Sequence, residues 1–110
     1  MIVMILCYMM VIYMFLRRYL DDFYFDMVMN NYDISYLESI DEDNFEKIYC
    51  LLKMYNFYYI NDIILNYIEI FSLDIDDVKN GIIELRNKLG SNYVYIIGND
   101  MRYLDCLLNN

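Results

Sequence analysis

The sequence contains no Ala, His, Pro, Gln, Thr or Trp, and only 3 Gly. Ala is normally among the commonest residues and is the best helix former, so physical chemistry gives no reason for its absence. Every codon for Ala, His, Pro, Gln and Thr contains cytosine, whereas each residue type present can be encoded without it. The composition therefore indicates a cytosine-poor message from an organelle or an AT-rich virus. Part of the Ile, Asn, Asp, Tyr and Met content then follows from that bias rather than from function.

The absence of His and the shortage of Gly argue against the common catalytic and metal sites. A Ser or Cys nucleophile would lack the usual imidazole base. A zinc site would have to be built from Cys7, Cys50 and Cys106, which are far apart in the sequence. The isolated glycines form no dinucleotide fingerprint and no phosphate-binding loop. We expect three buried thiols, no metal, no cofactor and no enzymatic activity.

Acidic residues outnumber basic ones by 17 to 8, which gives a net charge of −9. An acidic surface disfavours binding to duplex DNA, because phosphate contacts require basic side chains. Carboxylates cluster at Asp41–Asp43 and again at Asp74, Asp76 and Asp77. Neither cluster has the spacing of a calcium loop, and each precedes a run of apolar residues with helical period. We interpret both clusters as the beginnings of helices.

The first part of the chain is strongly apolar, in a sequence that is 60% hydrophobic and too aromatic to be disordered. Met1–Leu16 carries no charge and is followed by Arg17 and Arg18. A membrane span needs about 20 apolar residues, so this run is short unless Tyr19–Leu20 extends it past snorkelling arginines. The alternatives are a membrane anchor and a helix buried against partner proteins, and we favour the second. We assign 1–42 to an apolar N-terminal helical extension, with a short helix over Asp22–Met29.

Residues 43–110 are predicted to form a second domain of mixed secondary structure. Apolar side chains recur every three or four residues over Asn44–Phe57 and Asp74–Leu89, which predicts helices. Asp43 or Asn44 is expected to cap the first, and Gly90 to end the second. Two segments rich in β-branched and aromatic residues predict strands, and the last segment predicts a helix. These are Ile63–Phe71 and Tyr93–Ile97 for the strands, with a turn at Asn61–Asp62, and Met101–Leu108 for the helix. The predicted fold class is α+β.

Four pieces of this domain occur in a familiar order. They are Phe45–Leu52, Ile60–Ile70, Ile82–Leu89 with the following Tyr93–Ile97, and Tyr103–Leu108. In that order they resemble the third protein of the small ribosomal subunit, a KH-domain family. The third piece resembles the Leu-Arg helix and strand that end the KH domain, and the fourth resembles the opening of the next helix.

The resemblance implies a degenerate, reduced KH-like helix-strand-helix-strand unit over 43–110. It implies a structural component of the mitochondrial small ribosomal subunit, in the head near the mRNA entry path, of the kind encoded by kinetoplastid maxicircles. The partners would be other mitochondrial ribosomal proteins, with limited contact to the small-subunit rRNA. The family's Gly-x-x-Gly loop, which clamps the RNA backbone, is missing here. Any remaining RNA contact is assigned to Lys79, Arg86, Lys88 and Arg102.

Two other functions stay open. One is a membrane-anchored organellar or viral protein, with Met1–Leu20 as an N-terminal signal anchor in contact with the membrane. The other is a helical viral interaction module that inhibits host signalling. This last function explains the AT-rich composition but not the two predicted strands, so a predominantly helical chain without strands would favour it.

Overall fold

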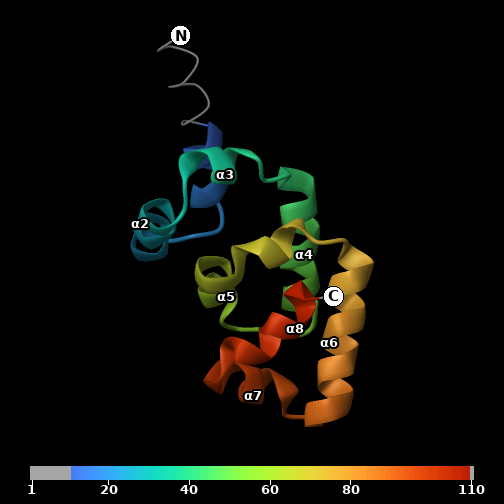
Figure 1. Cartoon of the computed structure of the whole chain (residues 1–110). Coiled ribbons are helices and arrows are strands. Elements are labelled where there is room, and N and C mark those ends of the chain that lie inside the picture. The colour runs from blue at the N-terminus through green and yellow to red at the C-terminus, as the bar shows by residue number, and fades with distance from the viewer. Residues whose placement is uncertain (1–10, 110) are drawn as a thin grey trace. The chain divides into compact units, whose positions relative to one another are not determined.

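The computed structural model describes residues 11–109 (Figure 1). By its internal contacts the chain divides into two compact units, Met1–Glu42 and Asp43–Asn110. All regular secondary structure in residues 11–109 is helical, and no strand occurs there. The predicted α+β class is therefore wrong, and with it the reduced KH-like unit over 43–110.

The first unit contains three described helical segments. Residues 11–17 are helical, α2 covers Asp22–Asn31 and α3 covers Ile34–Glu38. The short helix expected after residue 21 is confirmed. The backbone N–H of Tyr24 donates to a carboxylate oxygen of Asp21 at 3.0 Å and so caps α2. The loop expected after this helix contains α3, which the sequence analysis missed.

Both arginines that follow the apolar run are engaged within the first unit. The guanidinium of Arg17 lies 5.0 Å from the ring centroid of Tyr13 and 4.5 Å from that of Phe25. Arg17 also forms an ion pair with Asp22. Arg18 approaches Glu42 with an N–O distance of 3.8 Å. Cation–π contacts of this kind favour a fixed position for an arginine on an aromatic surface.

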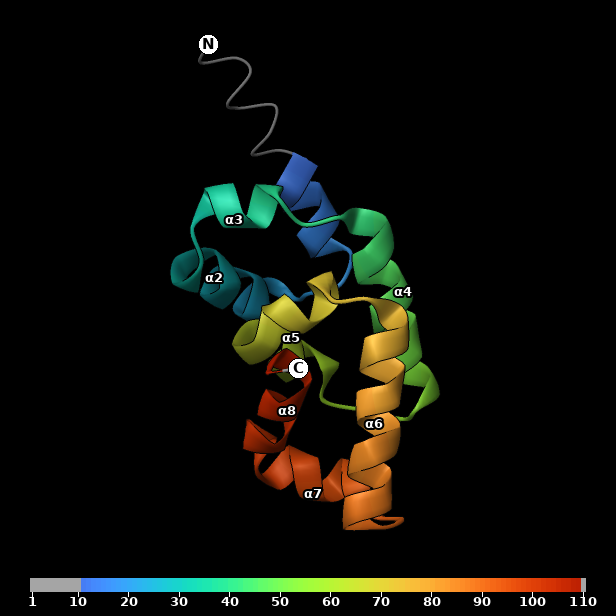
Figure 2. The same ribbon diagram turned by 45° about the vertical axis from the view of Figure 1, so that its right-hand side comes forward.

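The second unit is built from five α-helices and two 3₁₀ helices within its described residues (Figures 1 and 2). They are α4 Glu42–Met54, α5 Ile60–Tyr67, η1 Ile68–Ser72, α6 Ile75–Leu89, α7 Tyr93–Asn99, η2 Met101–Leu104 and α8 Asp105–Leu108. The helices predicted at α4, at α6 and at the C-terminal end are confirmed. Both views show α4 and α6 side by side.

Both predicted strands are helical. The segment Ile63–Phe71 belongs to α5 and η1, where Ile63, Ile64 and Leu65 are all buried. Three consecutive buried side chains do not fit a strand with one covered face, whose side chains alternate. A short run of β-branched residues cannot be distinguished from a buried helix by pattern alone, because β-propensity mainly reflects packing. The same ambiguity explains Tyr93–Ile97, which forms most of α7.

The core of the second unit centres on an aromatic pair. The rings of Phe45 and Phe71 are both fully buried and stack with centroids 4.5 Å apart. The prediction that Asp43 or Asn44 caps α4 is wrong, because α4 begins at Glu42 and contains both residues. Asn44 has another role. Its side-chain amide instead donates to the carbonyl oxygens of Phe71 and Leu73, at 2.8 and 2.9 Å. These bonds fix the end of η1 against the first turn of α4.

Helix α6 has the ends that its sequence predicts. The carboxylate of Asp74 accepts a hydrogen bond from the N–H of Asp76 at 2.8 Å. Gly90 follows the last turn with φ 86°, a conformation that L side chains rarely adopt. A small residue is also required inside α6. A Cβ placed on Gly81 would lie 1.9 Å from Cδ2 of Leu107, so α8 packs closely against α6 at this position.

Candidate functional site

The basic residues assigned to RNA contact do not converge on one surface. Lys79, Arg86 and Lys88 are exposed on α6. Lys79 and Arg86 are separated by about two helical turns and share a face, whereas Lys88 lies about half a turn further round. Burial raises the pKa of Cys106 and that of Tyr93, and the positive charges of Lys88 and Arg86, respectively, oppose the increase. Their contact with RNA stays a prediction.

Arg102 is held by a neighbouring carboxylate. Its guanidinium donates two hydrogen bonds to Asp100, at 2.9 and 2.8 Å, in a bidentate arrangement. These hydrogen bonds are the main reason that the pKa of Asp100 is lowered. They are also the main reason that the pKa of Arg102 is raised. An arginine already paired in this way has less capacity for a phosphate.

The described thiols differ from the expectation of buried cysteines. Cys50 is exposed and Cys106 is partly exposed, while Cys7 lies outside the described residues. Burial raises the pKa of the Cys106 thiol. Across residues 11–109, no group of three or more Cys, Asp and Glu side chains could hold a metal ion. The acidic clusters instead lie at the beginnings of α4 and α6, as the sequence analysis expected.

Three tyrosines of the second unit have raised pKa values. Burial is the largest cause for Tyr59, Tyr67 and Tyr93. The Tyr59 hydroxyl donates to the carbonyl oxygen of Val94, and a hydrogen bond to Asp105 adds to the effect on Tyr67. The hydrogen bonds of Tyr59 and Tyr67 thus connect the α5 region to α7 and α8.

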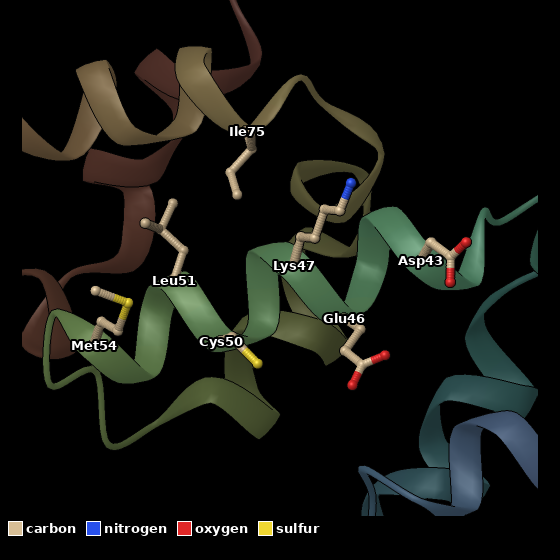
Figure 3. Close-up of a pocket in the computed structure, with 7 residues that line it drawn as sticks. All are labelled: Asp43, Glu46, Lys47, Cys50, Leu51, Met54 and Ile75. Carbon is tan, nitrogen blue, oxygen red and sulfur yellow. The ribbon is translucent and has the colours of Figure 1, made fainter.

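An open groove runs along the outer side of α4. It has a volume of about 390 Å³ and is bordered by the beginning of α6 (Figure 3). Its lining residues are Asp43, Glu46, Lys47, Cys50, Leu51, Met54 and Ile75. The six residues from α4 are spaced by one, three or four positions, which places them on one side of the helix. The groove therefore follows α4 for about three turns, or roughly 16 Å.

The two ends of this groove differ in chemistry. Asp43 and Glu46 line the end nearest the beginning of α4, whereas Met54 lies at the opposite end (Figure 3). Met54 is 77% exposed, although it is apolar, and Leu51 beneath it is 8% exposed. The side chain of Ile75 extends from α6 toward α4 (Figure 3). The arrangement is an apolar floor with an acidic end.

The groove combines apolar side chains with a few charged groups. Lys47, Asp43 and Glu46 are the charged residues among its lining residues, and Cys50 contributes an exposed thiol. Flexible Met side chains on a surface are typical of sites that adapt to apolar partners.

A second hollow, of about 370 Å³, lies in the first unit between Val11, Met14, Phe15, Arg18 and Glu42. Its lining begins at Val11, the first described residue, directly after the apolar residues 1–10. We take the groove along α4 as the candidate site, because the chain is described on both sides of every residue that lines it.

Sequence reasoning did not identify the groove. The helical pattern of α4 was recognised from its buried side, represented by Phe45, Ile48 and Leu52. The available signal was that Cys50 and Met54 are apolar residues that fall off this buried stripe. Exposed apolar residues point to a surface that another molecule covers where they form a contiguous patch, and here they line one groove.

Comparison of the chain with protein-family models, with curated proteins and with solved structures finds no match. The groove is therefore interpreted from its own geometry.

The first half of the predicted membrane anchor over Met1–Leu20, residues 1–10, lies outside the described part of the chain. From residue 11 onward, none of the helices combines the length and the apolar character that a membrane crossing requires.

Proposed function

We propose that this chain is a non-catalytic helical module that binds another protein through the groove along α4. The observation that carries the proposal is that the exposed side chains of Cys50 and Met54 line one groove together with Leu51 and with Ile75 of α6. The absence of strands from residues 11–109 supports the interaction-module hypothesis over the KH-like one.

The shape of the groove favours a helical segment as the bound element. A groove that follows a helix for about three turns offers contacts at the repeat of an amphipathic helix, with anchors at i, i+3 or i+4 and i+7. Its volume of about 390 Å³ accommodates a few side chains of such a helix but not a whole helix. The partner would therefore lie along the groove and insert its apolar residues between α4 and α6.

Selection of helical peptides against the full chain tests this proposal. The selected peptides are expected to shift the NMR signals of the Met54 and Ile75 methyl groups. Met54→Asp should abolish binding without unfolding the chain, because the side chain is 77% exposed. Tyr58→Asp is the matched control, since Tyr58 is 74% exposed and does not line the groove. Peptides that bind Met54→Asp as tightly as the unmodified chain would contradict the proposal.

The role in the mitochondrial small ribosomal subunit stays a prediction, as does mitochondrial localisation. Its support is the ordered sequence resemblance alone. The fold that this resemblance implies is not the observed one. A protein-binding module is compatible with such an assembly if the contacts are with other proteins. Sedimentation of detergent-solubilised mitochondria at high salt tests it, since a component held by protein packing should still migrate with the small-subunit rRNA.

A further inference from the structure

Carboxylates line one end of the groove along α4, and others are sequence neighbours of the α6 residue that borders it. Asp43 and Glu46 line one end of it. Asp74, Asp76 and Asp77 flank Ile75 in the sequence, and all three are exposed at the beginning of α6. The whole chain carries a net charge of −9. A ligand that enters the groove therefore meets a negative potential.

The carboxylates at the end of the groove are available to a partner. Within residues 11–109, neither Asp43 nor Glu46 takes part in an ion pair. Lys47 is the one basic residue among the groove's lining residues. The ammonium group of Lys53, on the same helix, lies 5.4 Å from the ring centroid of Tyr49. The local lysines therefore leave most of this negative charge uncompensated.

We infer that the groove binds a basic amphipathic helix, with apolar residues that insert between α4 and α6 and with Lys or Arg at the end that faces Asp43 and Glu46. This inference rests on the proposed protein-binding function and specifies its partner. Charge complementarity sets the orientation and speeds association, while the apolar contacts supply most of the affinity. A second copy of this chain is disfavoured as the occupant, because it would bring the same net charge of −9.

Three designed helical peptides and the full chain test this inference. Each peptide has about 18 residues, enough for the roughly 16 Å of groove and one further turn at each end. All three carry the same Leu residues at i, i+3, i+7 and i+10, and they differ at one end, which bears Lys, Gln or Glu. We expect the Lys peptide to bind at least about tenfold more tightly than the Glu peptide at low salt, with the Gln peptide between them. Added salt should reduce this difference.

Charge reversal on the chain should produce the reciprocal effect. Glu46→Lys combined with Asp43→Lys is expected to weaken binding of the Lys peptide roughly fivefold and to strengthen binding of the Glu peptide. Glu38→Lys combined with Glu84→Lys serves as the control, since it makes the same change in net charge at two exposed carboxylates, on α3 and α6, that do not line the groove. It should change both affinities by less than about twofold.

The outcomes separate this inference from the proposed function. If all three peptides bind equally and Met54→Asp abolishes binding, the groove is a protein-binding site but the basic partner is wrong. If the peptides bind Met54→Asp as well as the unmodified chain, or if none binds, both proposals are overturned. If the chain instead dimerises through the groove in sedimentation equilibrium and Met54→Asp makes it monomeric, the occupant is a second copy.

Discussion

The two sides of α4 perform different tasks with side chains of similar polarity. Phe45, Ile48 and Leu52 on the inner side are at most 1% exposed and build the core. Cys50 and Met54 on the outer side remain in contact with solvent and line the groove. Because the helix places positions three or four apart on one side, a shift of one or two residues moves a side chain from the core to the surface. Apolar character alone therefore does not reveal which residues stabilise the fold.

The largest expected effect is on the inner side. Phe45→Ala removes one ring of the stacked pair with Phe71 and leaves a cavity. The free energy of unfolding should fall by about 3–5 kcal/mol, measured by urea denaturation followed by circular dichroism. A loss below about 1 kcal/mol would mean that the inner side of α4 is not the centre of this core.

The inner side of α6 packs through a glycine, whereas the inner side of α4 packs through large side chains such as Phe45. Gly81→Val would force Leu107 out of its position, since even a Cβ at Gly81 lies 1.9 Å from Leu107 Cδ2. We expect a loss of about 1–3 kcal/mol in the free energy of unfolding. The pair Gly81→Val and Leu107→Ala should lose less than the sum of the two single changes. Strict additivity would indicate that α8 does not pack on Gly81.

A smaller effect is expected where α5 meets α7. Tyr59→Phe removes the hydrogen bond to Val94 and should cost about 1 kcal/mol near neutral pH. The pKa of Tyr59 is raised above its ordinary value of 10.0, mainly by burial. The folded state thus favours the protonated phenol, so this stabilisation is complete below pH 10.0 and is lost as the pH rises above it. Tyr59→Phe should reduce the alkaline loss of stability, monitored by circular dichroism with tyrosinate absorbance.

The smallest effect on stability is expected on the outer side of α4. Met54→Ala should change the free energy of unfolding by less than about 0.5 kcal/mol, since this side chain is 77% exposed. The same change should still weaken binding of the Leu-based peptides, because it removes part of the apolar surface of the groove. Scanning calorimetry of unfolding checks the first expectation, and titration calorimetry with the peptides checks the second. A large loss of stability without any loss of binding would reverse the roles that we assign to the two sides.

The helices α4 and α6 follow from their sequences because their apolar residues repeat at a helical period and acidic residues precede them. Helices α5 and α7 cannot be predicted in this way, because Ile and Tyr fit a strand and a buried helix equally well over a short run. Whether such a run forms a strand or a helix depends on which neighbours cover its side chains. For Ile63–Leu65, three consecutive side chains are covered in the folded chain, which excludes a strand with a single covered face.

The sequence by itself determined the acidic charge, the lack of histidine, and the ends of α6 at Asp74 and Gly90. These are local properties, set by residue type or by a few neighbouring bonds. Only the tertiary structure decided that the domain is helical and that Met54, Cys50 and Ile75 meet along one groove. The reason is that Ile75 is brought to α4 by packing across the 20 residues that separate it from the end of α4, which the period of a single helix does not encode.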